Sequence, residues 1–254
     1  MLLHLHEWGN PGAPPLVCLH GVTGHGRRFR RLAEERWARS FRVLAPDLRG
    51  HGLSGYEPPW TFATYADDVL ETIAAAGVER AVWVGHSFGG RLVLELFARA
   101  PERIERAVLL DPAIQVLPHV ALDFAEQSRQ DQAFASLEDA VAARLASTPT
   151  NPREAVEEDY AAHLAPSRDG LLRARMCRSA VVSVYGELAT ESPPPQTVTA
   201  PTLLVYAPAF GLVREDQLEA YTDRVQTVAV PGGHVVFWDA YEQTAAAVDE
   251  FLAS

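Results

Sequence analysis

Residues 85–89 read Gly-His-Ser-Phe-Gly, a spacing that could support nucleophilic catalysis by Ser87. An apolar run typical of a buried strand ends at Gly85, and a helical pattern begins near Gly90. A serine in a Gly-x-Ser-x-Gly turn between a strand and a helix is held with its hydroxyl group exposed. The N–H of Phe88 then points to where an oxyanion would form. The alternative is a glycine-rich crossover turn in which the serine is incidental.

A serine hydroxyl needs a base that accepts its proton, and His234 is the strongest candidate among the nine histidines. It follows Pro231, Gly232 and Gly233, at the end of the last expected strand. Because parallel strands end at the same edge of a sheet, His234 and Ser87 can meet there although they lie far apart in the sequence. The alternative is a histidine on a surface loop.

The elements that must position these residues alternate between strands and helices. The expected strands are residues 2–8, 16–19, 41–45, 81–84, 107–110, 202–206 and 225–230. The expected helices are residues 29–37, 64–76, 91–100 and 241–252, with Thr64 as a cap and Gly77 as a stop for the second. This alternation predicts an α/β fold with a mostly parallel central sheet and helices on both faces.

The alternation stops after Asp111-Pro112. Residues 113–198 are polar and helical in pattern, with several proline breaks and a run of three prolines at 193–195. We therefore predict a helical segment, residues 113–198, inserted into a core made of residues 1–112 and 199–254.

Composition excludes several classes of function. All 22 basic residues among the 254 are arginine, so Schiff-base and P-loop chemistry by a lysine is excluded. A net charge of −11 disfavours nucleic acid and anionic membranes as partners. No run approaches 18 apolar residues and the first residues do not resemble a signal peptide, so a cytoplasmic location is expected.

Metal and disulfide chemistry are not expected either. Cys18 and Cys177 are far apart and give no disulfide framework, and we expect free thiols. His4 and His6 alternate on an early strand far from the serine, and no group of residues has the spacing of a metal site. The sequence predicts no metal and no cofactor.

Four motifs together resemble the α/β-hydrolase fold superfamily, and the resemblance covers essentially the whole chain. They are His20-Gly21, residues 47–54, residues 85–90 and Gly233-His234. The resemblance implies that residues 113–198 form a cap. It also implies an oxyanion hole made by the N–H groups of Val22 and Phe88.

The same resemblance suggests roles for three polar residues near these motifs. His20 is expected to brace its loop rather than to take part in the chemistry. Asp47 and Arg49 are expected to be structural.

The triad acid departs from the family pattern. The stretch after the strand at 202–206 usually carries it, and here that position holds Phe210. Asp111 follows the strand before the insertion, at the same sheet edge, and some family members resemble that arrangement. We predict Asp111 as the acid that orients His234. The alternatives are Glu215 or Asp216, or no functional acid, in which case Asp111 only bonds local backbone N–H groups.

Six further side chains are weighed as substrate contacts, against ordinary packing or surface positions. Those in the insertion are Tyr160, His163, Met176 and Tyr185, and those after the base are Phe237 and Trp238.

The resemblance and the residues together predict a serine hydrolase that cleaves carboxylic esters of small or medium acyl chain. The same groups could also cleave a lactone, an amide or a carbon–carbon bond. A non-catalytic ligand-binding relative is the alternative from another class, favoured only by Phe210. The expected partner is a small-molecule ester, and nothing in the sequence indicates an oligomeric state.

Overall fold

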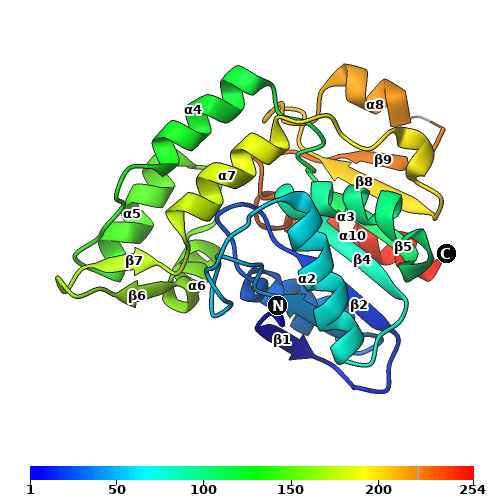
Figure 1. The fold of residues 1–254 in the computed structure, drawn as a ribbon, viewed down its shortest axis with the longest axis horizontal. Helices are drawn as coiled ribbons and strands as arrows, with labels where there is room; N and C mark the ends of the chain where they lie inside the picture. The colour runs from blue at the N-terminus through cyan, green and yellow to red at the C-terminus, as the bar shows by residue number, and fades with distance from the viewer. Residues whose placement is uncertain (222) are drawn as a thin grey trace.

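A single seven-stranded sheet organises the chain in the computed structural model, which describes residues 1–221 and 223–254 (Figure 1). Its strand order is β1-β3-β2-β4-β5-β8-β9; β1 runs antiparallel to β3, and the other neighbouring pairs are parallel. The strands are β1 (Leu5–Trp8), β2 (Pro15–Leu19), β3 (Arg42–Pro46), β4 (Ala81–His86), β5 (Ile104–Leu110), β8 (Thr202–Tyr206) and β9 (Gln226–Ala229). The predicted α/β class and mostly parallel sheet are confirmed.

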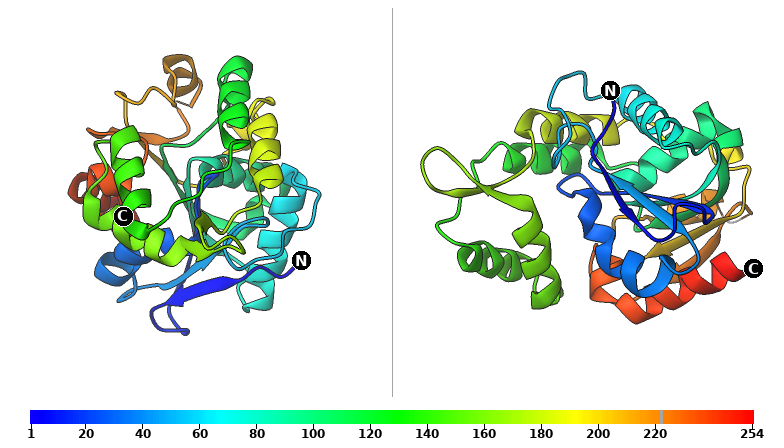
Figure 2. Two further views of the ribbon diagram at one scale, coloured as in Figure 1. Left: turned by 90° about the vertical axis from the view of Figure 1, so that its left-hand side faces the viewer. Right: turned by 90° about the horizontal axis from the view of Figure 1, so that it is seen from below.

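Helices cover both faces of the sheet because its central strands are apolar on both sides. All six residues of β4 are buried: Trp83 packs in one core layer with α2 (Phe62–Ala75) and α3 (Phe88–Arg99), and Val82 and Val84 pack in the other with α10 (Tyr241–Ala253). The right-hand view of Figure 2 shows the red α10 and the cyan α2 on opposite sides of the sheet. The longer core helices are α2 (Phe62–Ala75), α3 (Phe88–Arg99), α8 (Glu215–Tyr221) and α10 (Tyr241–Ala253). Shorter helical turns are η1 (Gly26–Phe29), α1 (Arg30–Leu32), η2 (Ala33–Trp37), η3 (Pro101–Arg103), η4 (Pro195–Thr197) and α9 (Val236–Asp239).

Helix α2 begins earlier than predicted. Thr61, not Thr64, is its N-cap, and the Thr61 side chain accepts a hydrogen bond from the Thr64 N–H at 3.3 Å. Both threonines can cap a helix, so the sequence alone does not choose between them. At the other end Gly77 adopts a φ of 79°, consistent with the predicted stop.

Residues 113–198 leave the sheet after β5 and return at β8, and residues 118–188 of this segment lie beyond the carboxyl ends of the strands (Figure 1). This inserted segment contains α4 (Pro118–Ser128), α5 (Leu137–Ser147), α6 (Arg153–His163) and α7 (Arg178–Leu188). It also contains an unpredicted antiparallel hairpin, β6 (Leu164–Pro166) with β7 (Leu172–Ala174). These strands have only three residues each, too few for an alternating pattern to appear in the sequence.

Arg91 of α3 fastens both ends of the inserted segment to the core. Its side chain is buried, and Nη1 and Nη2 donate to the carbonyls of Ile114 and Glu191, each at 2.6 Å. A buried guanidinium that loses these acceptors would be left unsatisfied, so the two ends stay attached.

Two expectations from composition can be compared with the structure. Cys18 is buried and Cys177 is partly buried, and both are free thiols. Within residues 1–221 and 223–254, no helix is both long enough and apolar enough to span a membrane.

The close packing of α3 on β2 gives a stability prediction. A Cβ atom on Gly89 would overlap the Leu19 carbonyl, whereas a Cβ on the exposed Gly186 of α7 would meet nothing within 4 Å. We expect Gly89→Ala to lower the free energy of unfolding by about 1–3 kcal/mol through overpacking. Gly186→Ala is the control and should raise it by about 0.5–1 kcal/mol. Denaturant unfolding of both variants measures the difference, and equal stabilities would contradict the packing described for Gly89.

Candidate active site

Ser87 lies in a strained turn between β4 and α3. Its φ is 55° and its ψ is −116°, values that a residue with a side chain rarely adopts. Two glycines make the turn possible, because a Cβ on Gly85 would overlap the Gly89 carbonyl and one on Gly89 would overlap Leu19. Strain of this kind is concentrated at functional sites.

Asp111 and His234 are joined by a short hydrogen bond at the same sheet edge. His234 Nδ1 lies 2.6 Å from Asp111 Oδ2, and the Asp111 side chain is fully buried. The other carboxylate oxygen accepts the N–H of Ala207 at 3.1 Å. Asp111 therefore bonds the backbone at the end of the neighbouring strand β8, 96 residues away in the sequence, and contacts the imidazole at the same time.

This pairing fixes the tautomer of His234. A carboxylate accepts hydrogen bonds, so Nδ1 carries the proton and Nε2 is left as an acceptor. The other two candidate acids lie elsewhere: Glu215 and Asp216 are exposed at the start of α8, and Asp216 pairs with Arg214 at 3.0 Å. Of the three candidates, only Asp111 contacts the imidazole.

The loop after β2 lies directly against Ser87. A Cβ on Gly21 would be 3.1 Å from the Ser87 Cβ, and Val22 is the next residue of this loop. Phe88 is the first residue of α3, and its N–H has no acceptor within the helix. The positive end of that helix also favours developing negative charge.

His20 holds this loop in place, as expected. Its Nε2 accepts the N–H of Leu48 at 2.9 Å, so the proton is on Nδ1, which donates to the Gly21 carbonyl at 2.8 Å. Burial lowers the pKa of His20 well below its ordinary value, which keeps the ring neutral.

Asp47 and Arg49 also make structural contacts. Asp47 accepts the N–H groups of Gly26 at 2.7 Å and Leu53 at 2.9 Å, and Arg49 pairs with Asp68 at 2.6 Å. Hydrogen bonds from His6 and the two backbone groups lower the pKa of Asp47, although burial opposes them.

Sequence reasoning missed two rings that contact His234. The Phe210 ring stacks on the imidazole with centroids 4.7 Å apart and an interplanar angle of 14°. The His86 ring lies 4.7 Å away, and its Nε2 donates to the His234 carbonyl at 3.0 Å. Burial and the nearby His234 lower the pKa of His86. Only the position of Phe210 at the usual acid site gave a signal, because its register already placed it near the base.

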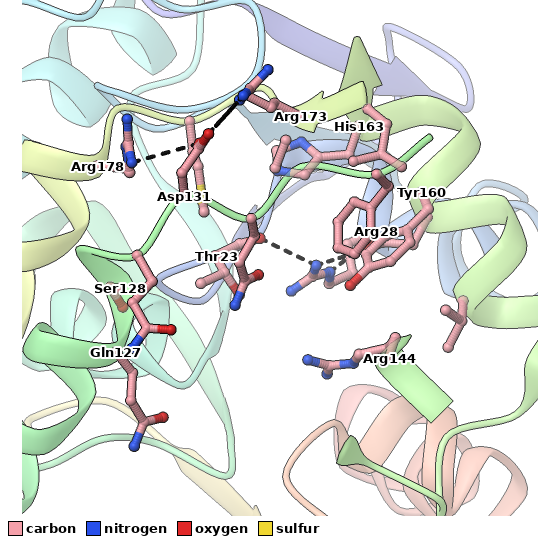
Figure 3. Close-up of a pocket in the computed structure, with 18 of the residues that line it drawn as sticks. Thr23, Arg28, Gln127, Ser128, Asp131, Arg144, Tyr160, His163, Arg173 and Arg178 are labelled. Carbon is pink, nitrogen blue, oxygen red and sulfur yellow. Dashed lines mark hydrogen bonds and ion pairs between the residues drawn. The ribbon is translucent and has the colours of Figure 1, made fainter. Parts of the chain in front are cut away.

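A cavity of about 380 Å³ lies between the inserted segment and the core (Figure 3). The core contributes Thr23, which follows Val22, and Trp238, which follows His234 by four residues. Both are sequence neighbours of candidate site residues, whereas Ser87, Asp111 and His234 do not themselves line the cavity. The four insertion residues weighed as substrate contacts all line it: Tyr160, His163, Met176 and Tyr185. Phe237 instead packs against Phe29.

One group of described residues could in principle hold a metal ion. The ligand atoms of His4, His6 and Asp47 lie within 4.8 Å of one another. Both Asp47 oxygens already accept backbone N–H groups, and Oδ1 also contacts His6 Nε2 at 3.1 Å. The hydrogen bonds of this cluster account for its geometry without an ion.

Comparisons with known proteins agree with this architecture. The sequence profile of the alpha/beta hydrolase fold matches residues 14–241. The chain is 32% identical to Lipase LipV of Mycobacterium tuberculosis over 227 residues, which cover 87% of this chain and 85% of that protein. It is 33% identical to Esterase YbfF of Escherichia coli, over 48% of this chain and 45% of the relative. The crystal structure of E-2-(Acetamidomethylene)succinate Hydrolase superposes with a TM-score of 0.91 at 25% identity, covering 99% of this chain and 95% of that one.

The buried His163 makes stability depend on pH. Burial, with a contribution from the stacked His25, lowers its pKa to about 3 from an ordinary 6.5. Between pH 6.5 and 3 the unfolded chain therefore binds a proton that the folded chain does not, so stability falls as the pH falls. His163 alone should lower the free energy of unfolding by about 2 kcal/mol when the pH falls from 7 to 5. Denaturant titrations at both pH values measure this loss. We expect the loss to be about 2 kcal/mol smaller in His163→Phe than in the wild type. Equal losses in the two proteins would contradict the role of His163.

Proposed function

The chain belongs to the α/β-hydrolase fold family and is a hydrolase of that family, and on this premise we propose that it cleaves carboxylic esters by serine catalysis. The observation that carries the proposal is the 2.6 Å bond between His234 Nδ1 and the buried Asp111, at the sheet edge where Ser87 is held at positive φ. The relatives named lipase and esterase support ester substrates.

The mechanism follows from the protonation states. Ser87 Oγ attacks the ester carbonyl while His234 Nε2 accepts its proton. The N–H groups of Val22 and Phe88 stabilise the oxyanion of the tetrahedral intermediate. His234 then protonates the leaving alcohol and activates the water that releases the acid, while Asp111 holds the tautomer and stabilises the imidazolium.

The inserted segment acts in this proposal as a cap, residues 113–198 on a core of residues 1–112 and 199–254. Its cavity of about 380 Å³ suits a small or medium acyl chain better than a lipid surface. We propose a small-molecule ester as the partner, with no role for nucleic acid, for a membrane or for a cofactor.

Hydrolysis of p-nitrophenyl esters from acetate to decanoate tests the proposal. Ser87→Ala should abolish turnover. Asp111→Asn should lower kcat by roughly 10³–10⁴-fold, because the wrong tautomer of His234 then faces the serine. A loss below tenfold in Asp111→Asn would overturn its role as the acid.

Asp216→Asn is the matched control, since among the described residues this surface carboxylate pairs with Arg214 alone. It should retain close to wild-type activity. Labelling by a fluorophosphonate separates the enzyme from a non-catalytic binding protein. Rapid labelling of Ser87 requires a working base, and wild-type protein that resists labelling would favour the binding protein.

A second candidate is cleavage of an amide. The neighbour with a TM-score of 0.91 has an acetamido group in the name of its substrate, and the same serine, base and oxyanion donors serve both reactions. Paired p-nitrophenyl butyrate and butyryl p-nitroanilide distinguish the two. A higher kcat/KM for the anilide than for the ester would favour an amide as the bond that the protein cleaves.

A further inference from the structure

The charges that line the cavity between the inserted segment and the core are unevenly balanced (Figure 3). Among the lining side chains that are charged at neutral pH, four are arginines and two are aspartates: Arg28, Arg144, Arg173, Arg178, Asp131 and Asp159. A cavity with an excess of two positive side chains is unexpected in a chain whose net charge is −11. Such a wall favours an anionic ligand.

Both aspartates already have cationic partners. Asp159 accepts a two-pronged ion pair from Arg28, at 2.9 Å to Oδ1 and 2.8 Å to Oδ2, and Oδ1 also contacts His25. Asp131 pairs with Arg173 at 2.6 Å and lies 3.6 Å from Arg178. These pairs leave Arg144 as the cavity arginine without a carboxylate partner among the described residues.

Arg144 is held in position by an amide. Its Nε donates to Asn151 Oδ1 at 3.0 Å, and Asn151 Nδ2 donates in turn to Asp239 at 2.8 Å. The other Asp239 oxygen accepts the N–H of Gly233, in the loop that carries the base. Asp239 therefore hydrogen-bonds to the Asn151 amide and does not pair with the Arg144 guanidinium.

The two terminal nitrogens of Arg144 face the cavity. Neither Nη1 nor Nη2 has a hydrogen-bond partner within residues 1–221 and 223–254, and in Figure 3 the guanidinium points to the open centre of the pocket. Burial and the nearby Arg28 lower the pKa of Arg144, yet a guanidinium stays charged in proteins. Arg144 is partly buried, and a partly desolvated cation without a counter-ion is stabilised by a ligand that provides one.

Two polar side chains of α6 face the same space. His163 is only 2% exposed, and neither of its ring nitrogens has a hydrogen-bond partner in the part of the chain that the structure describes. Its ring stacks on His25 with centroids 4.6 Å apart, so the nitrogen edge is fixed in place. Tyr160 lines the cavity as well. A neutral imidazole and a phenol can each donate one hydrogen bond to an anion.

We propose that this cavity binds a carboxylate group of the substrate, with Arg144 as its counter-ion and Tyr160 and His163 as additional donors. One unpaired guanidinium matches one negative charge, and its two free Nη groups fit the two oxygens of a planar carboxylate. The inference rests on the proposed function, because it assigns the substrate class of the same site: esters or amides of acids that carry a second carboxylate. Thr23 and Trp238 connect this anion site to the loops of the oxyanion donor and the base.

Binding of glutarate to the Ser87→Ala protein tests the anion site without turnover. Calorimetry should detect glutarate but not pentane-1,5-diol, a neutral chain of the same length. Arg144→Gln should weaken glutarate binding by about tenfold to a hundredfold, the loss typical of a charge-assisted hydrogen-bonded pair. Tyr160→Phe should weaken it less and serves as a second variant if Arg144→Gln does not fold. Arg153→Gln is the control, since Arg153 of α6 pairs with Glu138 and Glu157 outside the cavity.

A pair of substrates then tests selectivity. Mono-p-nitrophenyl adipate carries a terminal carboxylate, and p-nitrophenyl 6-oxoheptanoate replaces it with a methyl ketone of similar size. We expect the wild type to prefer the carboxylate, and the ratio of the two kcat/KM values to fall at least tenfold in Arg144→Gln but not in Arg153→Gln.

The outcomes separate the two proposals. Absence of glutarate binding, or binding that survives in Arg144→Gln, overturns the anion site even if esters are hydrolysed. Glutarate binding that depends on Arg144, in a protein that hydrolyses no ester and resists the fluorophosphonate, supports the anion site and overturns the proposed function.

Discussion

The buried carboxylate of Asp111 is the constraint on which the rest of the site depends. A fully buried anion is stable only when its oxygens are hydrogen-bonded. Here one oxygen takes the N–H of Ala207, at the end of β8, and the other takes Nδ1 of His234, which follows β9. The ends of three parallel strands, β5, β8 and β9, are thus tied together by one side chain. The same side chain therefore links this sheet edge and fixes the orientation of the His234 ring.

The backbone strain at this sheet edge occurs in two turns that are hydrogen-bonded to each other. Ser87 and Asp111 are the non-glycine residues with positive φ among those described, at 55° and 41°, and they follow the adjacent strands β4 and β5. The Ser87 N–H is bonded to the Leu110 carbonyl, and its own carbonyl accepts the N–H of Ala113. These bonds lock the two turns to each other, so neither can relax alone. The energy that holds the buried Ser87 in this strained conformation comes from the packed sheet below it.

Sequence predicted the parts of the site that depend on local pattern. Apolar runs ending in glycine placed Ser87 and His234 at strand ends, and Phe210 in the acid position directed attention to Asp111. The parts it could not predict depend on contacts between distant segments. The β6–β7 hairpin is too short to show a period, and both Thr61 and Thr64 suit a helix cap. Arg144 lacks a carboxylate partner among the described residues, and this can be recognised only when the partners of Arg28, Arg173 and Arg178 are known.

The position of the Asp111 carboxylate affects what residue 210 can do. With the carboxylate supplied from the end of β5, residue 210 no longer has to carry charge, and Phe210 lies parallel to the imidazole of His234. An aromatic face over the ring excludes water from one side of the Asp111–His234 pair. Lower local polarity strengthens that hydrogen bond, because less solvent competes for it. The half-exposed Phe210 therefore shields one face of the hydrogen bond between His234 and the buried Asp111 from water.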